Sequence, residues 1–126
     1  TDALAATRAV LEGVVFALAD CEDALRATGT EIGSLLALGG GSRSEYWLAA
    51  LATALNLPVD LPEDGEFGAA FGAARLGMMA ATGAGAEIAY RPPIRRTVEP
   101  QAGLVDAFAE GHARHVAARN SIAGLP

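Results

Sequence analysis

Apolar residues recur at helical spacing in four stretches of the chain, and two short apolar runs lie between these stretches. The spacing predicts helices over residues 3–27, from about 43 to 55, from 64 to about 81, and from 104 to 120. One apolar stripe on each helix is expected to face the core. The stripe is Val10, Val14, Leu18, Cys21 and Leu25 on the first helix, Phe67, Phe71, Ala74 and Met78 on the third, and Leu104, Phe108 and Val116 on the last.

The two apolar runs predict short parallel strands at residues 35–38 and 58–61. The first run contains no polar residue, which is typical of a strand buried on both faces. Residues 84–103 have no periodicity and are predicted to form a loop. Since helices alternate with strands, the predicted fold class is a helix-rich α/β domain with two parallel strands and four main helices.

Several features predict that the chain is a piece of a larger domain. Two strands are too few for a stable open sheet. The sequence opens at Thr1 almost directly into a helical pattern, and 52% of its residues are hydrophobic, against roughly 45–50% in typical soluble domains. We therefore expect some apolar surface to meet a partner or another part of the parent protein.

Charge and cysteine content exclude several classes of protein. The net charge is −6 and the chain has no Lys, so it lacks the basic surface of a nucleic-acid-binding module. Arg91, Arg95 and Arg96 are interpreted as a solvated loop. Arg75 interrupts the longest apolar run, so no membrane span is expected. Cys21 is the only cysteine, which rules out an intrachain disulfide and favours a reducing, cytoplasmic location.

The segment from the first predicted strand into the second helix is the strongest candidate for chemistry. Gly39, Gly40 and Gly41 follow a buried strand, and ligands of α/β folds bind at that end of a strand. Glycines let a flat ligand touch the backbone, and the next helix directs free N–H groups there. Ser42 and Glu45 have capping-box spacing, which would leave the Ser44 hydroxyl for a ligand.

Adenine or ribose suits this corner better than phosphate, since the chain lacks the Lys of a phosphate-binding loop and the third glycine of a dinucleotide fingerprint. Tight packing alone would also explain the three glycines.

The other polar clusters favour structural roles. His112 and His115 have a possible metal spacing, but no carboxylate or thiol completes a ligand set. Glu63, Asp64 and Glu66 precede a predicted helix, where capping by Asp64 and favourable helix-dipole electrostatics explain them. Trp47 is expected in the core. No catalytic or metal-binding residue is assigned from the sequence.

Three segments in order resemble the FGGY family of carbohydrate kinases, C-terminal half, and most of all its xylulokinase subgroup. They are residues 8–14 (RAVLEGV), 38–47 (LGGGSRSEYW) and 71–76 (FGAARL). The likeness runs from about residue 3 to 82, with a looser fit to 120.

The resemblance implies two domains of actin-like, ribonuclease-H-like fold that transfer the γ-phosphoryl group of ATP, with Mg²⁺, to a sugar hydroxyl, here that of D-xylulose. It makes residues 1–126 the nucleotide-binding C-terminal part of the second domain, with a loop at 84–103 and a last helix at 104–120. The adenosine contacts fall on Gly39, Gly40, Gly41 and Ser44, although relatives often have Asn at the position of Ser44.

The resemblance also implies what the chain lacks. The family's catalytic Asp and phosphate motifs have no counterpart here, so we expect no kinase activity from the chain alone and weak adenosine binding at best. Its partners would be the missing N-terminal domain and, through an exposed strand edge, a second copy of the chain; the parent could also form a homodimer. Ribulose, glycerol, gluconate and fuculose remain open as substrates, as does a non-catalytic, partner-binding actin-like module.

Overall fold

The computed structural model describes residues 2–63 and 68–124. Within them the chain forms four α-helices, three short strands and three 3-10 turns. In order they are α1 (Ala3–Ala27), β1 (Leu35–Leu36), η1 (Gly40–Arg43), α2 (Glu45–Leu55), β2 (Val59–Pro62), α3 (Gly68–Thr82), η3 (Ala86–Ile88), β3 (Ile94–Val98), η4 (Ala102–Leu104) and α4 (Val105–Ala123). The helix-rich α/β class is confirmed, with one strand more than predicted.

The sheet is mixed, with the strand order β1-β2-β3. β1 runs parallel to β2, with Leu35 opposite Val59, which confirms the predicted parallel pair. The pairing extends a little beyond β1, since the Ala37 N–H donates to the Asp60 carbonyl at 2.9 Å. β3 lies antiparallel to β2, with Val59 opposite Val98. Among the described strands, β1 therefore has a neighbour on one side only.

β3 corrects the prediction of a loop over residues 84–103. Three of its five residues are β-branched, which favours an extended chain. Its two arginines interrupt the alternation of apolar and polar residues by which a strand is predicted from sequence. An edge strand tolerates such charges on both faces. The Arg96 guanidinium binds both carboxylate oxygens of Glu45, at 2.8 and 2.9 Å. Arg91 binds Asp60 of β2 at 2.7 Å, so this basic cluster is partly engaged in ion pairs rather than wholly solvated.

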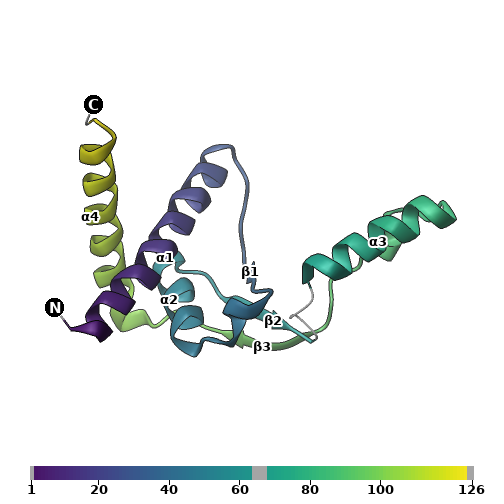
Figure 1. Ribbon diagram of the computed structural model, residues 1–126, viewed down its shortest axis with the longest axis horizontal. Helices are drawn as coiled ribbons and strands as arrows, with labels where there is room; N and C mark the ends of the chain where they lie inside the picture. The colour runs from purple at the N-terminus through teal and green to yellow at the C-terminus, as the bar shows by residue number, and fades with distance from the viewer. Residues whose placement is uncertain (1, 64–67, 125–126) are drawn as a thin grey trace.

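The core lies where α1, α2 and α4 meet, beside the sheet (Figure 1). One cluster joins Val15 and Ala19 of α1 to Ala50 and Leu55 of α2, and a second joins α2 to β2. Phe108 of α4 packs edge-on against Phe16, with ring centroids 6.2 Å apart.

The apolar stripe that was predicted to face the core on α1 was wrong. Val10, Val14, Leu18 and Leu25 are 68%, 44%, 41% and 50% exposed, and Cys21 is exposed as well. The buried positions are Val15, Phe16, Ala19 and Glu22. Both sides of this helix are apolar, so periodicity alone could not tell which side α2 and α4 cover.

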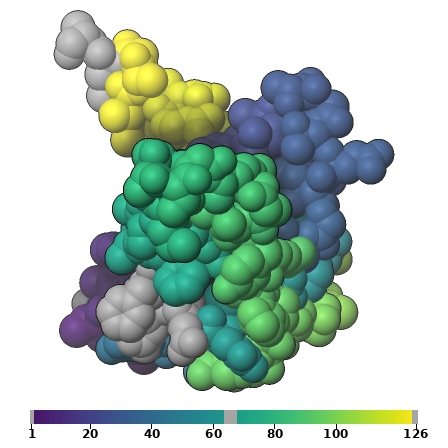
Figure 2. Space-filling model, turned by 90° about the vertical axis from the view of Figure 1, so that its right-hand side faces the viewer, coloured from purple at the N-terminus to yellow at the C-terminus, as the bar shows by residue number. Residues whose placement is uncertain are grey.

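α3 projects from the sheet, away from α1 and α4 (Figure 1). Viewed from that end, α3 and the segment after it form much of the face nearest the viewer (Figure 2). None of its described side chains is buried, and Phe71 and Met78 are 52% and 55% exposed. The predicted core stripe on this helix was therefore wrong. Its proposed cap Asp64 and the stripe residue Phe67 lie outside the described residues.

α4 starts one residue later than predicted and continues to Ala123. Of its predicted stripe, Phe108 packs on the core, whereas Leu104 lies in η4 and is 44% exposed. In the described part of the chain, no helix is long and apolar enough to cross a membrane.

Candidate functional site

The glycine corner, residues 39–41, connects the carboxyl end of β1 to the start of α2. Gly39 has φ 81° and ψ −172°, a region that only glycine occupies readily. A side-chain Cβ built on Gly39 or Gly40 would meet no atom within 4 Å. The backbone of these two residues is therefore open to a ligand.

The third glycine serves packing within the chain. A Cβ on Gly41 would lie 2.4 Å from Cζ3 of Trp47, so the indole ring fills that side of the corner. Trp47 packs against the core cluster, as expected, and its buried Nε1 has no hydrogen-bond partner among the described residues. The packing explanation therefore holds for Gly41, whereas Gly39 and Gly40 have no packing role in the described part of the chain that would explain them.

The helix cap predicted at Ser42 is formed by Ser44 instead. The Ser42 hydroxyl donates to the Gly39 carbonyl at 2.7 Å inside η1, and Ser44 is the N-cap of α2, where its Oγ accepts from the Trp47 N–H at 3.3 Å. The 3-10 turn over Gly40–Arg43 takes up Arg43, where the capping-box pattern placed the start of the helix, and Ser44 becomes the cap. As an acceptor in the cap, the Ser44 hydroxyl still has its own proton to donate to a ligand.

The position of Glu45 indicates what kind of ligand suits the start of α2. It is the first residue of α2, and its carboxylate is held beside the end of the helix by Arg96. A carboxylate at that place already satisfies the positive end of the helix dipole. Because this place at the helix end is already taken by the carboxylate and its Arg96 partner, an uncharged adenine or ribose fits better than a phosphate.

A polar cluster that the sequence analysis did not single out joins α1 to the first turn of α2. The Tyr46 hydroxyl donates to Glu12 Oε1 at 2.6 Å. The Arg8 guanidinium donates to the same carboxylate oxygen at 2.9 Å and to the Tyr46 oxygen at 3.1 Å. The hydrogen bond from Tyr46, followed by those from Arg8, lowers the pKa of the Glu12 carboxyl.

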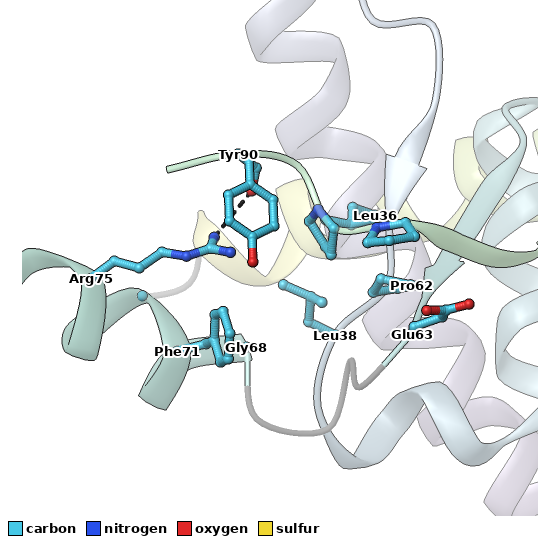
Figure 3. A pocket seen from close by; sticks show the side chains of 11 residues that line it. Leu36, Leu38, Pro62, Glu63, Gly68, Phe71, Arg75 and Tyr90 are labelled. Carbon is cyan, nitrogen blue, oxygen red and sulfur yellow. Dashed lines mark hydrogen bonds between the residues drawn. The ribbon is translucent and has the colours of Figure 1, made fainter. Parts of the chain in front are cut away.

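An apolar recess lies on the other side of Leu38, between α3 and the sheet (Figure 3). It holds about 280 Å³, and none of the corner residues or Ser44 lines it. Arg75 lies between the rings of Phe71 and Tyr90, at 4.5 and 4.4 Å from their centroids. The recess and the glycine corner are separate places that share only the end of β1.

The remaining sequence candidates have structural partners. His112 Nε2 lies 2.8 Å from Asp20 Oδ1, and this hydrogen bond lowers the pKa of Asp20. His115 packs on Phe16, with ring centroids 5.7 Å apart. Glu63 lines the recess, while Asp64 and Glu66 fall outside the described residues. No group of three or more His, Cys, Asp or Glu in residues 2–63 and 68–124 could hold a metal ion.

Comparisons with known proteins agree on one family. Residues 1–81 match the model of the C-terminal domain of the FGGY family of carbohydrate kinases. The chain is 49% identical to xylulose kinase of Escherichia coli K12 over 74 residues, which are 59% of this chain and 15% of that protein. It is 35% identical to the xylulose kinase of Bacillus subtilis over 78 residues, 62% of this chain and 15% of that protein.

A crystal structure described as a xyloylose kinase from Brucella ovis superposes with a TM-score of 0.86 and 54% identity, covering 100% of this chain and 26% of that one. Xylulose kinase from Rhodospirillum rubrum has the same fold, with a TM-score of 0.69 and 23% identity over 91% of this chain and 24% of that one. The chain thus spans a minor part of the relatives it matches. By the family model and by these relatives, it belongs to the C-terminal domain of the FGGY family of carbohydrate kinases.

Proposed function

We propose that this chain is the ATP-binding C-terminal part of a sugar kinase that transfers the γ-phosphoryl group of ATP to D-xylulose. The nucleoside would lie on Gly39, Gly40 and Gly41 and form a hydrogen bond with the Ser44 hydroxyl. The sugar kinase class follows from the family. The choice of D-xylulose is supported by the names of its relatives, since the proteins matched at 49% and 35% identity are both xylulose kinases.

One observation carries the proposal. At the carboxyl end of a strand in a parallel pair, the backbone of Gly39 and Gly40 is uncovered by side chains, and the first turns of η1 and α2 follow directly. A purine can stack on such a backbone without displacing any side chain. Because Glu45 occupies the helix end, we expect the phosphates to extend away from α2, so that only the nucleoside touches this corner.

The rest of the reaction needs groups that we do not assign to this chain. In the transfer, a sugar hydroxyl oxygen forms a bond to the γ-phosphorus, the bond to the β-phosphate oxygen breaks, and the hydroxyl proton passes to a base. No described residue is placed as that base, and no described cluster fits the Mg²⁺ that neutralises the phosphates. We therefore propose that residues 1–126 are the second-domain part of a two-domain cytoplasmic kinase.

The test is a titration of the isotopically labelled chain with ADP, followed by the amide NMR signals of the three corner glycines. We expect these signals to move and to saturate. Gly40→Val should abolish the shifts of Gly39 and Gly41, because it places a side chain over the open backbone at a position where a Cβ meets no atom within 4 Å. Gly33→Val is the matched control, since Gly33 is equally free of neighbours but lies before β1. Unmoved corner signals at saturating ADP would refute the assignment.

A further inference from the structure

The cluster of Arg8, Glu12 and Tyr46 lies next to the glycine corner but touches none of its glycines. Tyr46 is the second residue of α2 and comes two positions after Ser44. Its hydroxyl reaches across 34 residues of sequence to the Glu12 carboxylate of α1. This polar link therefore lies where it can hold the start of α2 in place.

The two helices are joined at two separate places. The core cluster joins Val15 and Ala19 to Ala50 and Leu55, which belong to the middle and the end of α2, and Trp47 of the first turn packs against it. The bond from Tyr46 to Glu12 joins the first turn of α2. Apolar contacts resist separation but have little directional preference, whereas a hydrogen bond fixes distance and angle. The second attachment therefore sets the direction in which α2 enters the corner.

The cluster of Arg8, Glu12 and Tyr46 contributes little to the free energy of folding. The Arg8 side chain is 58% exposed, and an ion pair so exposed contributes little to stability. Tyr46 is 39% exposed, so it buries only part of its ring. What remains is one short, charge-assisted bond from Tyr46 to a carboxylate whose side chain is 24% exposed. Such a bond constrains geometry more than it adds to the free energy of folding.

The constraint reaches the corner through Trp47. This residue follows Tyr46 in the same helical turn, its ring covers Gly41, and its N–H binds the Ser44 cap. A rotation of the first turn of α2 would move the Trp47 ring and the Ser44 oxygen together. The Ser44 hydroxyl is one of the groups proposed to contact the nucleoside, and the Trp47 ring packs on the third glycine of the corner.

We infer that Tyr46, held by Glu12, is a positioning residue that fixes the first turn of α2 and thereby the glycine corner for nucleotide binding. This inference rests on the proposed function for its ligand, but its geometric part stands by itself. Arg8 assists by orienting the Glu12 carboxylate.

The experiment compares Tyr46→Phe with His112→Gln in the labelled chain. His112 also links α1 to another helix by a bond to a carboxylate, and it is similarly half-buried, but it lies on α4. Without any ligand, Tyr46→Phe should change the amide shifts and relaxation of Gly39, Gly40 and Gly41, while His112→Gln leaves them unchanged. With ADP, Tyr46→Phe should raise the dissociation constant about fivefold, because the loosened first turn of α2 must be ordered again when the nucleotide binds, and the control should not.

Glu12→Gln provides a further check, because the amide still accepts from Tyr46 but lacks the charge. We expect an intermediate effect, and the double variant Tyr46→Phe/Glu12→Gln should be no worse than Tyr46→Phe alone. If the corner signals and the ADP affinity of Tyr46→Phe match those of the unaltered chain, the positioning role is refuted. If the unaltered chain does not bind ADP, the proposed function fails, and the ligand-free comparison still decides whether Tyr46 positions the corner.

Discussion

The indole ring of Trp47 occupies the space that a side chain on Gly41 would need, with 2.4 Å between Cζ3 and an ideal Cβ. Aromatic carbons cannot approach a methyl group so closely. Gly41 and Trp47 therefore form one packed unit, and any larger residue at position 41 must displace the ring from the core cluster that it contacts.

Because of this contact, we expect substitutions at Gly40 and Gly41 to differ in their effect on stability. Gly41→Ala should lower the free energy of unfolding by about 1–3 kcal/mol through overpacking, whereas Gly40→Ala, which meets no atom within 4 Å, should change it little. Urea denaturation of the two variants is the measurement. Equal stability of both variants would contradict the packing role of Gly41.

The edge of β1 should make the chain self-associate. In residues 2–63 and 68–124, β1 has a partner strand on one side only, and Leu36 and Leu38 beside that edge are 36% and 46% exposed. Unpaired backbone next to apolar side chains recruits other chains. Light scattering should show concentration-dependent growth in mass, reduced by Leu36→Lys. Ile122→Lys, at an apolar position of 66% exposure near the end of α4, should have no such effect, and a stable monomer at high concentration would contradict the prediction.

The helices could be predicted from the sequence because their cause is local. α1 has the predicted bounds, and Asp2 caps it by accepting from the Ala5 N–H at 2.8 Å. Which face of it is buried was not predictable, since Val14 and Val15 are equally apolar and only the placement of α2 and α4 buries the second. Burial depends on tertiary contacts that periodicity does not encode when both faces are apolar.

The candidate site, too, could be predicted from the sequence only where its cause is local. The strand, the three glycines and the following helix are where the sequence placed them, but two serines within reach of the helix start offered two possible caps. The Ser-x-x-Glu pattern favoured Ser42, whereas the 3-10 turn makes Ser44 the cap. The bond between Tyr46 and Glu12 joins residues 34 positions apart, and no local pattern could reveal it.

α3 should be the least protected helix in hydrogen exchange. None of its described side chains is buried, and Arg75 ties it to the following segment through the Tyr90 carbonyl at 3.1 Å and the Tyr90 ring. Segments with few buried apolar contacts open easily. Its amides should exchange much faster than those of α2, and faster still in Arg75→Ala. Arg114→Ala, an exposed change on α4, is the control, and equal protection of α3 and α2 would contradict this expectation.

Acid should destabilise the chain through carboxylates that its folded state holds ionised. Hydrogen bonds from Tyr46 to Glu12 and from His112 to Asp20 are the largest causes that lower these two pKa values. A lowered folded-state pKa contributes stability that is present above the unfolded-state value of about 4 and is lost as pH falls through the folded-state value. The free energy of unfolding should therefore decline below about pH 4.

Glu12→Gln removes one of these groups, so its free energy of unfolding should start lower at pH 7 and fall less steeply in acid. Glu99→Gln is the matched control, since Glu99 is exposed and its carboxylate accepts no hydrogen bond within the described part of the chain. That variant should keep the slope of the unaltered chain. Urea titrations at a series of pH values give both slopes, and a Glu12→Gln slope equal to that of the control would show that the Tyr46 bond does not favour the ionised carboxylate.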